Sequence, residues 1–353
     1  MDQQKINWHK GSINMTKASD RKNIHLDLAR GSLAQSQLSS DLDMVVLTHN
    51  ALPEVNFDDV CLTTRVLGKP LKMPLLIGAM TGGTDRADQL NLTLAAAAEA
   101  HGVALAVGSQ RASLEDKRPQ QAIRDAAPSV PIIGNLGGVQ LAADNGLDLA
   151  KRAVDALEAD ALAIHLNPLQ EIAQPEGDRD WRQVEDAITK AVRQLDCPII
   201  VKEVGAGISA DVAGRLKAAG VQMIDVAGVG GTNWTRIETL RRDNADIMAP
   251  FLDWGISTRD AIMDIKIAHP DLRLIASGGI RNGLDAAKGI WLGAELAAAA
   301  GHFLRAAEND DGDASPATLH QALADWHQQM KITLFLTGAK NLAEFRNIDG
   351  KIY

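Results

Sequence analysis

The chain has 353 residues, of which 46% are hydrophobic and 23% charged, a composition typical of one large globular domain with a substantial core. Acidic residues outnumber basic ones by 45 to 36, and the net charge of -9 disfavours a protein that coats nucleic acid or an anionic membrane. No stretch approaches the roughly 18 consecutive apolar residues of a membrane-spanning helix, and the first residues lack the apolar core of a signal peptide, so we expect a cytoplasmic protein.

The N-terminal part of the chain is predicted to be an addition to the main fold. We expect one domain over residues 1–353, in which residues 1–73 form an N-terminal arm with a strand-like segment at 61–67, and residues 74–353 form a barrel. The two cysteines, Cys61 and Cys197, lie far apart in apolar runs. A disulfide or a zinc site is therefore not expected, and both thiols are predicted to be buried as small apolar side chains.

From Pro74 onward, short apolar runs alternate with longer helical patterns, which is typical of βα units on a parallel sheet. The predicted strands cover residues 74–79, 103–108, 131–135, 161–166, 198–203, 223–228, 272–279 and 295–301. Their number matches the roughly eight strands of an α/β TIM (β/α)8 barrel. A doubly wound sheet would give the same alternation, so the barrel prediction depends on the strand number and on the motifs after the last strands.

A long stretch after the sixth predicted strand, Val229 to Ser257, is expected to be an irregular insertion. It follows a glycine-rich turn and carries Trp234, Arg236, Glu238 and Asp253 among polar residues. Loops over barrel active sites often have this character, so the insertion is a candidate lid.

Polar residues and glycines gather directly after the strands, at the end of the barrel where such enzymes place their chemistry. They are Thr81, Gly82, Gly83, Ser109, Gln110, Arg111, Asn135, His165, Asn167, Gln170, Glu171, Lys202, Glu203, Gly230, Gly231, Thr232, Gly278, Gly279 and Arg281. Each has a purely structural explanation as well: the glycines could form ordinary turns, and Asn135 could cap a helix near Gly138. His165 could be a hydrogen-bonded core residue, and Lys202 could extend to solvent. The common position of the whole set favours an enzyme.

The segment SGGIRNG, beginning at Ser277, predicts a phosphate site. A Gly-Gly turn after the seventh strand leads into a helix, and Gly301 ends the eighth predicted strand. In such barrels backbone N–H groups at these two turns face a phosphate, and Arg281 adds a cation with fork geometry.

Lys202 lies at the end of the fifth predicted strand, where a cation could stabilise negative charge on a flat ring with polar edges. FMN has that shape. The surrounding strand ends carry polar residues that could bond to its edge, namely Thr81, Ser109, Asn135 and Thr232.

From Arg21 to about Gly301 the chain resembles the type 2 isopentenyl diphosphate isomerases. The motifs that carry the resemblance are RKNIH at Arg21, GAMTGG at Gly78, GSQR at Gly108, HLNPLQE at His165, VKEVGAG at Val201, AGVGGTNW at Ala227, FLDWGI at Phe251 and SGGIR at Ser277. The RKNIH arm and HLNPLQE are specific to that family, whereas GGIR occurs in many FMN barrels.

The resemblance implies that the protein moves a double bond, converting isopentenyl diphosphate into dimethylallyl diphosphate for isoprenoid biosynthesis. Reduced FMN would act as acid and base together with the catalytic residues His165 and Gln170, and NAD(P)H would reduce the flavin. Glu171 would bind Mg²⁺ with the diphosphate. The FMN ligands would be Thr81, Gly82, Gly83, Ser109, Asn135, Lys202, Thr232, Gly279, Arg281, Ala300 and Gly301. The substrate ligands would be Arg21, Lys22, His25, Ser109, Gln110, Arg111, Asn167 and Gln170.

The resemblance also implies a homo-oligomer, a tetramer or octamer, that has no nucleic-acid or membrane partner. One alternative is an FMN-dependent 2-hydroxy-acid oxidoreductase on the same barrel. It needs a catalytic His and Arg late in the chain, whereas His302 lies past the last predicted strand without such a context. A barrel similar to inosinate dehydrogenase would need a loop cysteine, and Cys61 and Cys197 are in the wrong places. A non-catalytic phosphate-binding barrel would leave Glu171, Gln170 and the arm without a role.

Overall fold

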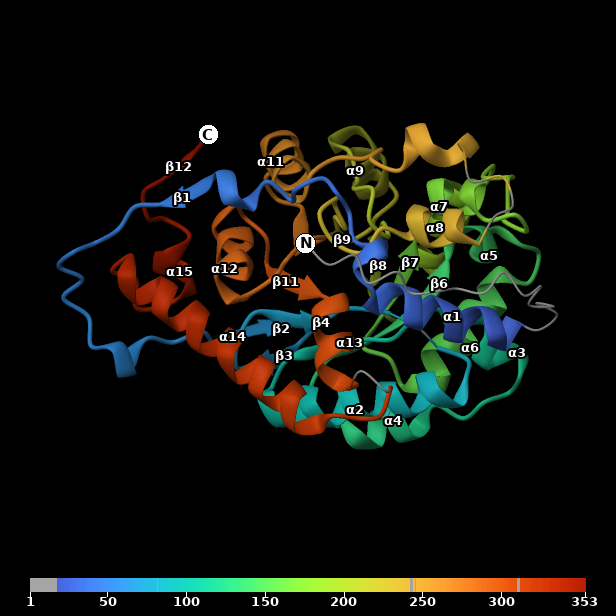
Figure 1. The fold of residues 1–353 in the computed structure, drawn as a ribbon, viewed down its shortest axis with the longest axis horizontal. Helices are drawn as coiled ribbons and strands as arrows, with labels where there is room; N and C mark the ends of the chain where they lie inside the picture. The colour runs from blue at the N-terminus through green and yellow to red at the C-terminus, as the bar shows by residue number, and fades with distance from the viewer. Residues whose placement is uncertain (1–17, 81, 242–243, 245, 310–311) are drawn as a thin grey trace, which may run out of the picture.

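The computed structural model describes residues 18–80, 82–241, 244, 246–309 and 312–353, with the side chains of residues 18–21 outside the description. Its centre is a closed barrel of parallel strands in the circular order β4-β5-β6-β7-β8-β9-β10-β11 (Figure 1). All eight predicted strands are confirmed. Their bounds are Leu75–Ile77, Ala104–Ala106, Ile132–Gly137, Ala161–His165, Ile199–Lys202, Met223–Asp225, Arg273–Ser277 and Leu296–Ala299.

Helices surround the barrel and also extend both ends of the chain (Figure 1). The α-helices are α1 Ala18–Arg30, α2 Asp85–His101, α3 Arg111–Glu115, α4 Gln121–Ala126, α5 Gly138–Ala142, α6 Gly146–Leu157, α7 Pro168–Ala173, α8 Val184–Gln194, α9 Ala210–Ala218, α10 Trp234–Leu240, α11 Thr258–Ala268, α12 Gly283–Trp291, α13 Gly301–Ala307, α14 Pro316–Leu336 and α15 Leu342–Phe345. The 3-10 helices are η1 Ser32–Ala34, η2 Leu42–Met44, η3 Phe57–Asp59 and η4 Asp246–Phe251.

The barrel strands are apolar on both faces because one face lines the barrel interior and the other packs on the helices. Leu76 and Ile133 belong to an interior cluster, whereas their neighbours Leu75 and Ile132 belong to the cluster under the outer helices. At the carboxyl ends the register aligns His165 with Lys202, and Lys202 with Asp225. Three adjacent strands therefore bring polar side chains to one end of the barrel.

A β-hairpin closes the opposite end of the barrel. Strands β2, Thr64–Val66, and β3, Lys69–Leu71, pair in antiparallel fashion across Leu67 and Gly68, whose φ angles are 50° and 77°. Two positive φ angles in a row are typical of the type I′ turn that suits a two-residue hairpin. Val66 and Leu71 pack into the interior cluster of the barrel. The hairpin occupies only part of the predicted strand-like segment 61–67.

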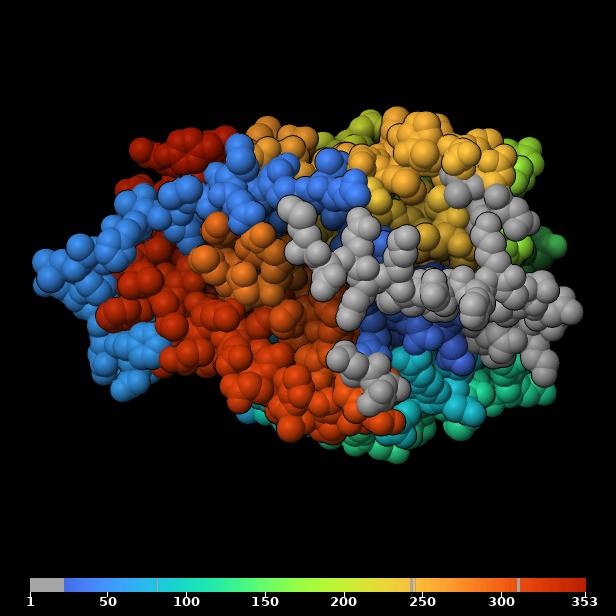
Figure 2. Space-filling view, in the orientation of Figure 1, coloured from blue at the N-terminus to red at the C-terminus, as the bar shows by residue number. Residues whose placement is uncertain are grey.

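The N-terminal arm packs on the carboxyl end and one side of the barrel. Helix α1 contacts α10 and α13, and Leu26 and Ala29 are buried in the larger core cluster. Strand β1, Val45–Leu47, pairs with the C-terminal strand β12, Gly350–Ile352. Figure 2 shows the blue atoms of the arm lying beside the orange and red atoms of the C-terminal part. The arm therefore shares the larger core cluster with the barrel.

The insertion after β9 is more regular than expected. An isolated bridge between Val229 and Ser257 closes it, at the predicted boundaries. Between them α10 is capped by Asn233, whose side chain accepts a hydrogen bond from the Arg236 backbone N–H, and η4 follows. The prediction of an irregular stretch was therefore wrong for these two helices, because TNW supplies a helix start that composition alone did not reveal.

The prediction of two buried cysteines was wrong for Cys61, which is exposed, and Cys197 is only partly buried. Cys61 lies outside the hairpin and forms an isolated bridge with Asn341, so the short strand does not extend over it. Cys197 precedes β8 at the edge of the barrel. Within the described part of the chain, no helix is both long and apolar enough to cross a membrane.

Candidate active site

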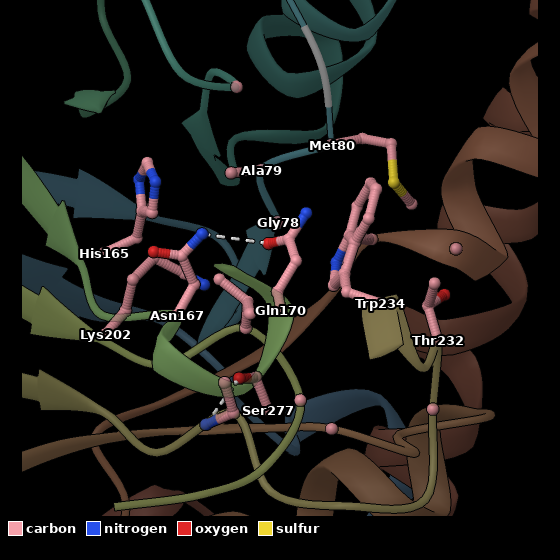
Figure 3. A pocket seen from close by; sticks show the side chains of 18 of the residues that line it. Gly78, Ala79, Met80, His165, Asn167, Gln170, Lys202, Thr232, Trp234 and Ser277 are labelled. Carbon is pink, nitrogen blue, oxygen red and sulfur yellow. Dashed lines mark hydrogen bonds between the residues drawn. The ribbon is translucent and has the colours of Figure 1, made fainter. Parts of the chain in front are cut away.

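A cavity of about 620 Å³ opens at the carboxyl ends of the strands. Its lining comes from the arm, from the loops after the strands and from α10. In Figure 3, His165, Asn167 and Lys202 lie on one side, Met80 and Trp234 on the other, and Gln170 between them. The predicted site residues in the lining are Lys22, His25, Gly82, Ser109, Arg111, Asn135, His165, Asn167, Gln170, Glu171, Lys202, Thr232, Gly279, Arg281, Ala300 and Gly301.

Two predicted residues that the structure describes, Gln110 and Gly83, do not line the cavity. Thr81 and the side chain of Arg21 lie outside the described residues. Gln110 is buried with its amide turned to the protein, donating to Gln120 at 2.6 Å and to the Ala153 carbonyl at 2.9 Å and accepting from the Asn135 N–H. Gly83 has a φ of +84° and shapes the turn before α2. Gln110 and Gly83 therefore stabilise the loops around the cavity and do not face a ligand in it.

His165 is held at the end of β7 by Asn135. The Asn135 amide donates to the Val107 carbonyl at 3.1 Å, so its oxygen faces His165 Nδ1 at 2.8 Å and that nitrogen must donate. Asn135 lies inside β6, and the N-cap of α5 is Gly137, so the capping explanation for Asn135 was wrong. His165 consequently turns the lone pair of Nε2 away from Asn135, as an acceptor or base.

The pKa of His165 is lowered to about 3, first by desolvation and then by the positive charges of Lys202, Arg111 and Lys22. His165 is therefore neutral near pH 7. Between pH 6.5 and about 3 the unfolded chain binds more protons at this histidine than the folded one does. The free energy of unfolding therefore decreases as the pH falls through that window.

We therefore expect His165→Gln to flatten the decline of the unfolding free energy between pH 6.5 and about 4, by up to about 1.4 kcal/mol for each pH unit. Urea unfolding at several pH values measures this. His49→Gln, which changes an exposed histidine outside the cavity, serves as the control. Equal pH slopes for wild type and His165→Gln would show that the imidazole is not held neutral.

The ends of the next strands carry a lysine and a buried carboxylate. Lys202 lines the cavity and its ammonium donates to the Glu203 carbonyl. Asp225, beside it in the register, accepts from the Ser277 hydroxyl. Burial raises the pKa of Asp225, against the opposing effects of Lys202 and Ser277. The floor of the cavity thus combines a fixed cation with a desolvated acid.

Glycines from two loops leave backbone exposed along one wall. A Cβ on Gly231 would lie 2.8 Å from the Gly279 nitrogen, and a Cβ on Gly279, whose φ is +70°, would lie 2.7 Å from the Gly230 carbonyl carbon. Side chains are excluded where these loops cross, so backbone groups line the cavity. A backbone-lined wall of this kind suits a phosphate, which accepts bonds from N–H groups.

Gln170 is held by hydrogen bonds from two directions. Asn167 donates to the Gln170 carbonyl oxygen at 3.1 Å, and the Gln170 amide donates to Glu238 at 3.2 Å. Glu238 is fully buried and also pairs with His25 at 3.0 Å and with Arg241. The insertion and the arm therefore meet at the carboxylate that orients Gln170.

One wall of the cavity is apolar. Trp234 packs edge-on against His25 with ring centroids 5.5 Å apart, and Met80 is the other large apolar side chain in the lining near it (Figure 3). Trp234 begins α10, so the predicted lid does contribute directly to the cavity. A short hydrocarbon chain could lie against these two side chains while a charged group faced the cations.

Glu171 is the predicted metal ligand and lines the cavity. Its carboxylate accepts from the Asn167 amide at 3.0 Å and from the Asp178 N–H at 2.8 Å. Over the described ranges, no group of three or more His, Cys, Asp or Glu side chains is arranged to hold a metal ion. A divalent cation here would therefore need phosphate oxygens or water to complete its coordination, as Mg²⁺ commonly does.

Sequence reasoning missed several cavity residues because it stopped at the strand ends. Asp225 is inside a predicted strand, and Arg305 lies one helical turn beyond Gly301. Residues four apart lie on the same face of a helix, so Arg305 could have been predicted to lie beside Gly301 in the helix that follows the last strand. His302, which was judged to lack an active-site context, also lines the cavity.

Comparison with known proteins gives relatives over nearly the whole chain. A family model described as FMN-dependent dehydrogenase matches residues 140–348. An isopentenyl-diphosphate delta-isomerase from Xanthobacter autotrophicus is 46% identical over 338 residues, covering 94% of this chain and 97% of that protein. An isopentenyl-diphosphate delta-isomerase from Pseudescherichia vulneris is 44% identical, covering 93% of this chain and 95% of that protein.

Solved structures of lower identity share the fold. A mandelate oxidase with benzoyl-formic acid superposes with a TM-score of 0.65 at 16% identity, covering 94% of this chain and 97% of that chain. A mandelate oxidase with (S)-4-hydroxymandelic acid also superposes with a TM-score of 0.65, at 15% identity, covering 94% of this chain and 98% of that chain.

Proposed function

The chain belongs to the isopentenyl-diphosphate delta-isomerase family, within the broader FMN-dependent dehydrogenase family, and from this premise we propose that it converts isopentenyl diphosphate into dimethylallyl diphosphate. The observation that carries the proposal is one cavity with an apolar wall at Met80 and Trp234 and cations at Lys22 and Arg111. A small prenyl diphosphate matches this cavity, because its hydrocarbon can lie against the apolar wall while its diphosphate faces the cations. Isoprenoid biosynthesis is the corresponding role.

The residues present fit FMN as the cofactor. The wall where the glycine loops cross excludes side chains and suits a phosphate, and Lys202 with Asn135 and Ser109 offers polar groups to the edge of a flat ring. The residues proposed to hold FMN are Gly82, Ser109, Asn135, Lys202, Thr232, Gly279, Ala300 and Gly301. Gly83 follows Gly82 in the turn, Arg281 also lines the cavity, and Thr81, a further predicted ligand, is outside the described residues. When bound in its reduced form, FMN would supply a proton donor and acceptor beside the substrate alkene.

The protein side chains would bind and orient the substrate. Arg111 and Lys22, together with Arg21, would face the diphosphate, because two phosphates need several cations. Arg111 and Lys22 line the same cavity as His165. Asn167 would position Gln170 against the hydrocarbon, and His25 would close the arm side of the cavity.

His165 and Gln170 are proposed to act near the reacting carbons. Neutral His165 can accept a proton at Nε2, while Asn135 fixes its ring. Gln170 carries no titratable proton, so its contribution would be orientation through Asn167 and Glu238. Glu171 is proposed to bind Mg²⁺ shared with the diphosphate. NAD(P)H as the reductant of the flavin, a homo-oligomeric assembly and a cytoplasmic location complete the proposal.

An observation at His302 disfavours a hydroxy-acid oxidoreductase. The Trp326 indole donates to His302 Nε2 at 3.2 Å, and desolvation followed by Arg305 lowers the pKa of His302. The lone pair of Nε2 is therefore already used, and Nδ1 carries the proton of the neutral ring. A base that abstracts a substrate proton would need that lone pair free.

The test is turnover of isopentenyl diphosphate in deuterated buffer with FMN, Mg²⁺ and NAD(P)H. We expect deuterium in the product methyl group, many turnovers per NAD(P)H consumed and no turnover with oxidised flavin under air, because the isomerisation involves no net oxidation. Stoichiometric oxidation of NAD(P)H, or full activity with oxidised flavin, would contradict the proposal.

A further inference from the structure

We propose that Arg305, and not Arg281, supplies the cationic side chain that binds the phosphate of FMN and lets the protein distinguish FMN from riboflavin. The inference rests on the proposed FMN site and assigns one part of it to a residue that the sequence motifs did not indicate. It concerns the wall formed by Gly231, Gly279 and Gly301.

Arg305 reaches the glycine wall from the second turn of α13. Its Nη1 lies 3.2 Å from the point where a Cβ on Gly301 would be, and the Thr232 hydroxyl lies 3.0 Å from the same point. A guanidinium and a hydroxyl thus converge beside a residue that has no side chain of its own. Both groups donate hydrogen bonds, and a phosphate oxygen is the acceptor that such a pair fits.

Arg281 is already neutralised by two carboxylates. Its guanidinium pairs with Asp43 at 2.6 Å and with Asp285 at 2.7 Å. Asp285 is buried, and its side chain also accepts from the Arg281 backbone N–H. To bind a phosphate, Arg281 would have to bring that anion close to both carboxylates or give up its bonds to them, and either change is unfavourable.

Arg305 differs from Arg281 in its described charged partners. Among the residues that the structure describes, no carboxylate pairs with it, and desolvation at the cavity wall lowers its pKa. The positive charge of Arg305 acts on His302, whereas the charges of Lys22 and Arg111 act on His165. Arg305 lies beside Gly301, whereas the Lys22 ammonium donates to the Gly82 carbonyl, so the cavity offers cations in two places, one for each phosphate-bearing ligand.

The test compares the affinities of the flavin-free full-length protein for FMN and riboflavin, measured by quenching of flavin fluorescence. Arg305→Gln should weaken FMN binding roughly tenfold or more, since a bond to a charged phosphate is lost, and change riboflavin binding less than twofold. Arg305→Lys should recover part of the loss, because it keeps the charge. Unchanged riboflavin binding also shows that the variant is folded.

Two controls make the outcome specific. Arg193→Gln, an exposed arginine on α8, should leave both affinities unchanged, and Arg281→Gln should reduce the preference for FMN less than Arg305→Gln does. The inference is overturned if Arg305→Gln keeps the wild-type preference for FMN, or weakens both flavins equally. It is also overturned if the variant raises the KM for isopentenyl diphosphate at saturating FMN while FMN affinity is unchanged. A wild-type protein that bound neither flavin would instead refute the proposed function.

Discussion

Replacing Glu238 with alanine is expected to lower the free energy of unfolding by about 3–5 kcal/mol, the usual effect of removing one partner from a buried ion pair. Glu238 is fully buried, and His25, Arg241 and Gln170 all bond to its carboxylate. Its loss would leave the largely buried Arg241 with Glu176, 3.1 Å away, as its one acidic partner among the residues that the structure describes. His25 of the arm would lose its carboxylate partner in the insertion and keep its packing against Trp234.

The same variant should reduce kcat/KM for isopentenyl diphosphate roughly tenfold or more, because the Gln170 amide would lose a bond to a charged group. Glu238→Gln should retain an acceptor for Gln170 and recover part of the activity, but little of the stability. A matched control is Asp253→Asn, which breaks the more exposed pair with Arg236, 2.9 Å apart, in the same insertion, and should cost less than about 1 kcal/mol. Similar losses for the two sites would contradict the buried network.

The stabilising effect of Glu238 should also depend on pH. Desolvation alone would raise its pKa, but His25 and Arg241 outweigh that effect and the pKa is lowered from the ordinary value of 4.5. A lowered carboxylate pKa stabilises the folded state above the unfolded-state value and loses that effect as the pH falls through the folded-state pKa. The stability difference between wild type and Glu238→Ala should therefore shrink below about pH 4.5, as measured by urea unfolding.

Glu171→Gln is expected to raise the Mg²⁺ concentration needed for half-maximal activity at least roughly tenfold, while FMN affinity changes less than twofold. An amide keeps the shape of the side chain but removes the anionic oxygen that Mg²⁺ prefers. Asn167 donates to one carboxylate oxygen and the Asp178 N–H to the other, so the single amide oxygen of glutamine can keep one of these two bonds to the loop. Magnesium titration of turnover, with flavin binding measured separately, gives both quantities.

Glu54→Gln, which changes an exposed carboxylate of the arm, is the matched control and should leave the Mg²⁺ requirement unchanged. An unaltered Mg²⁺ requirement in Glu171→Gln would remove the metal assignment. A parallel loss of FMN affinity would show instead that Glu171 supports the whole cavity.

The strands, their order and the end of the barrel that carries the cavity could be predicted from the sequence, because these features depend on local patterns. Apolar runs such as the one ending at His165 read as buried strands, and side chains that follow parallel strands must meet at one end. The same reasoning placed His165, Lys202 and Gly279 at a common site before any distance was known.

Only the tertiary structure decided which polar groups are available to a ligand. Gln110 and Arg281 look like ligands by position, yet the first bonds to Gln120 and the second to Asp43, residues whose proximity no local pattern reveals. The same is true of Arg305, which lines the cavity from α13, and of Glu238, which is buried in α10 and bonds to Gln170 of the cavity. Strand ends follow from chain periodicity, but the pairing of a charge depends on contacts between residues far apart in sequence, and those contacts form only when the chain packs.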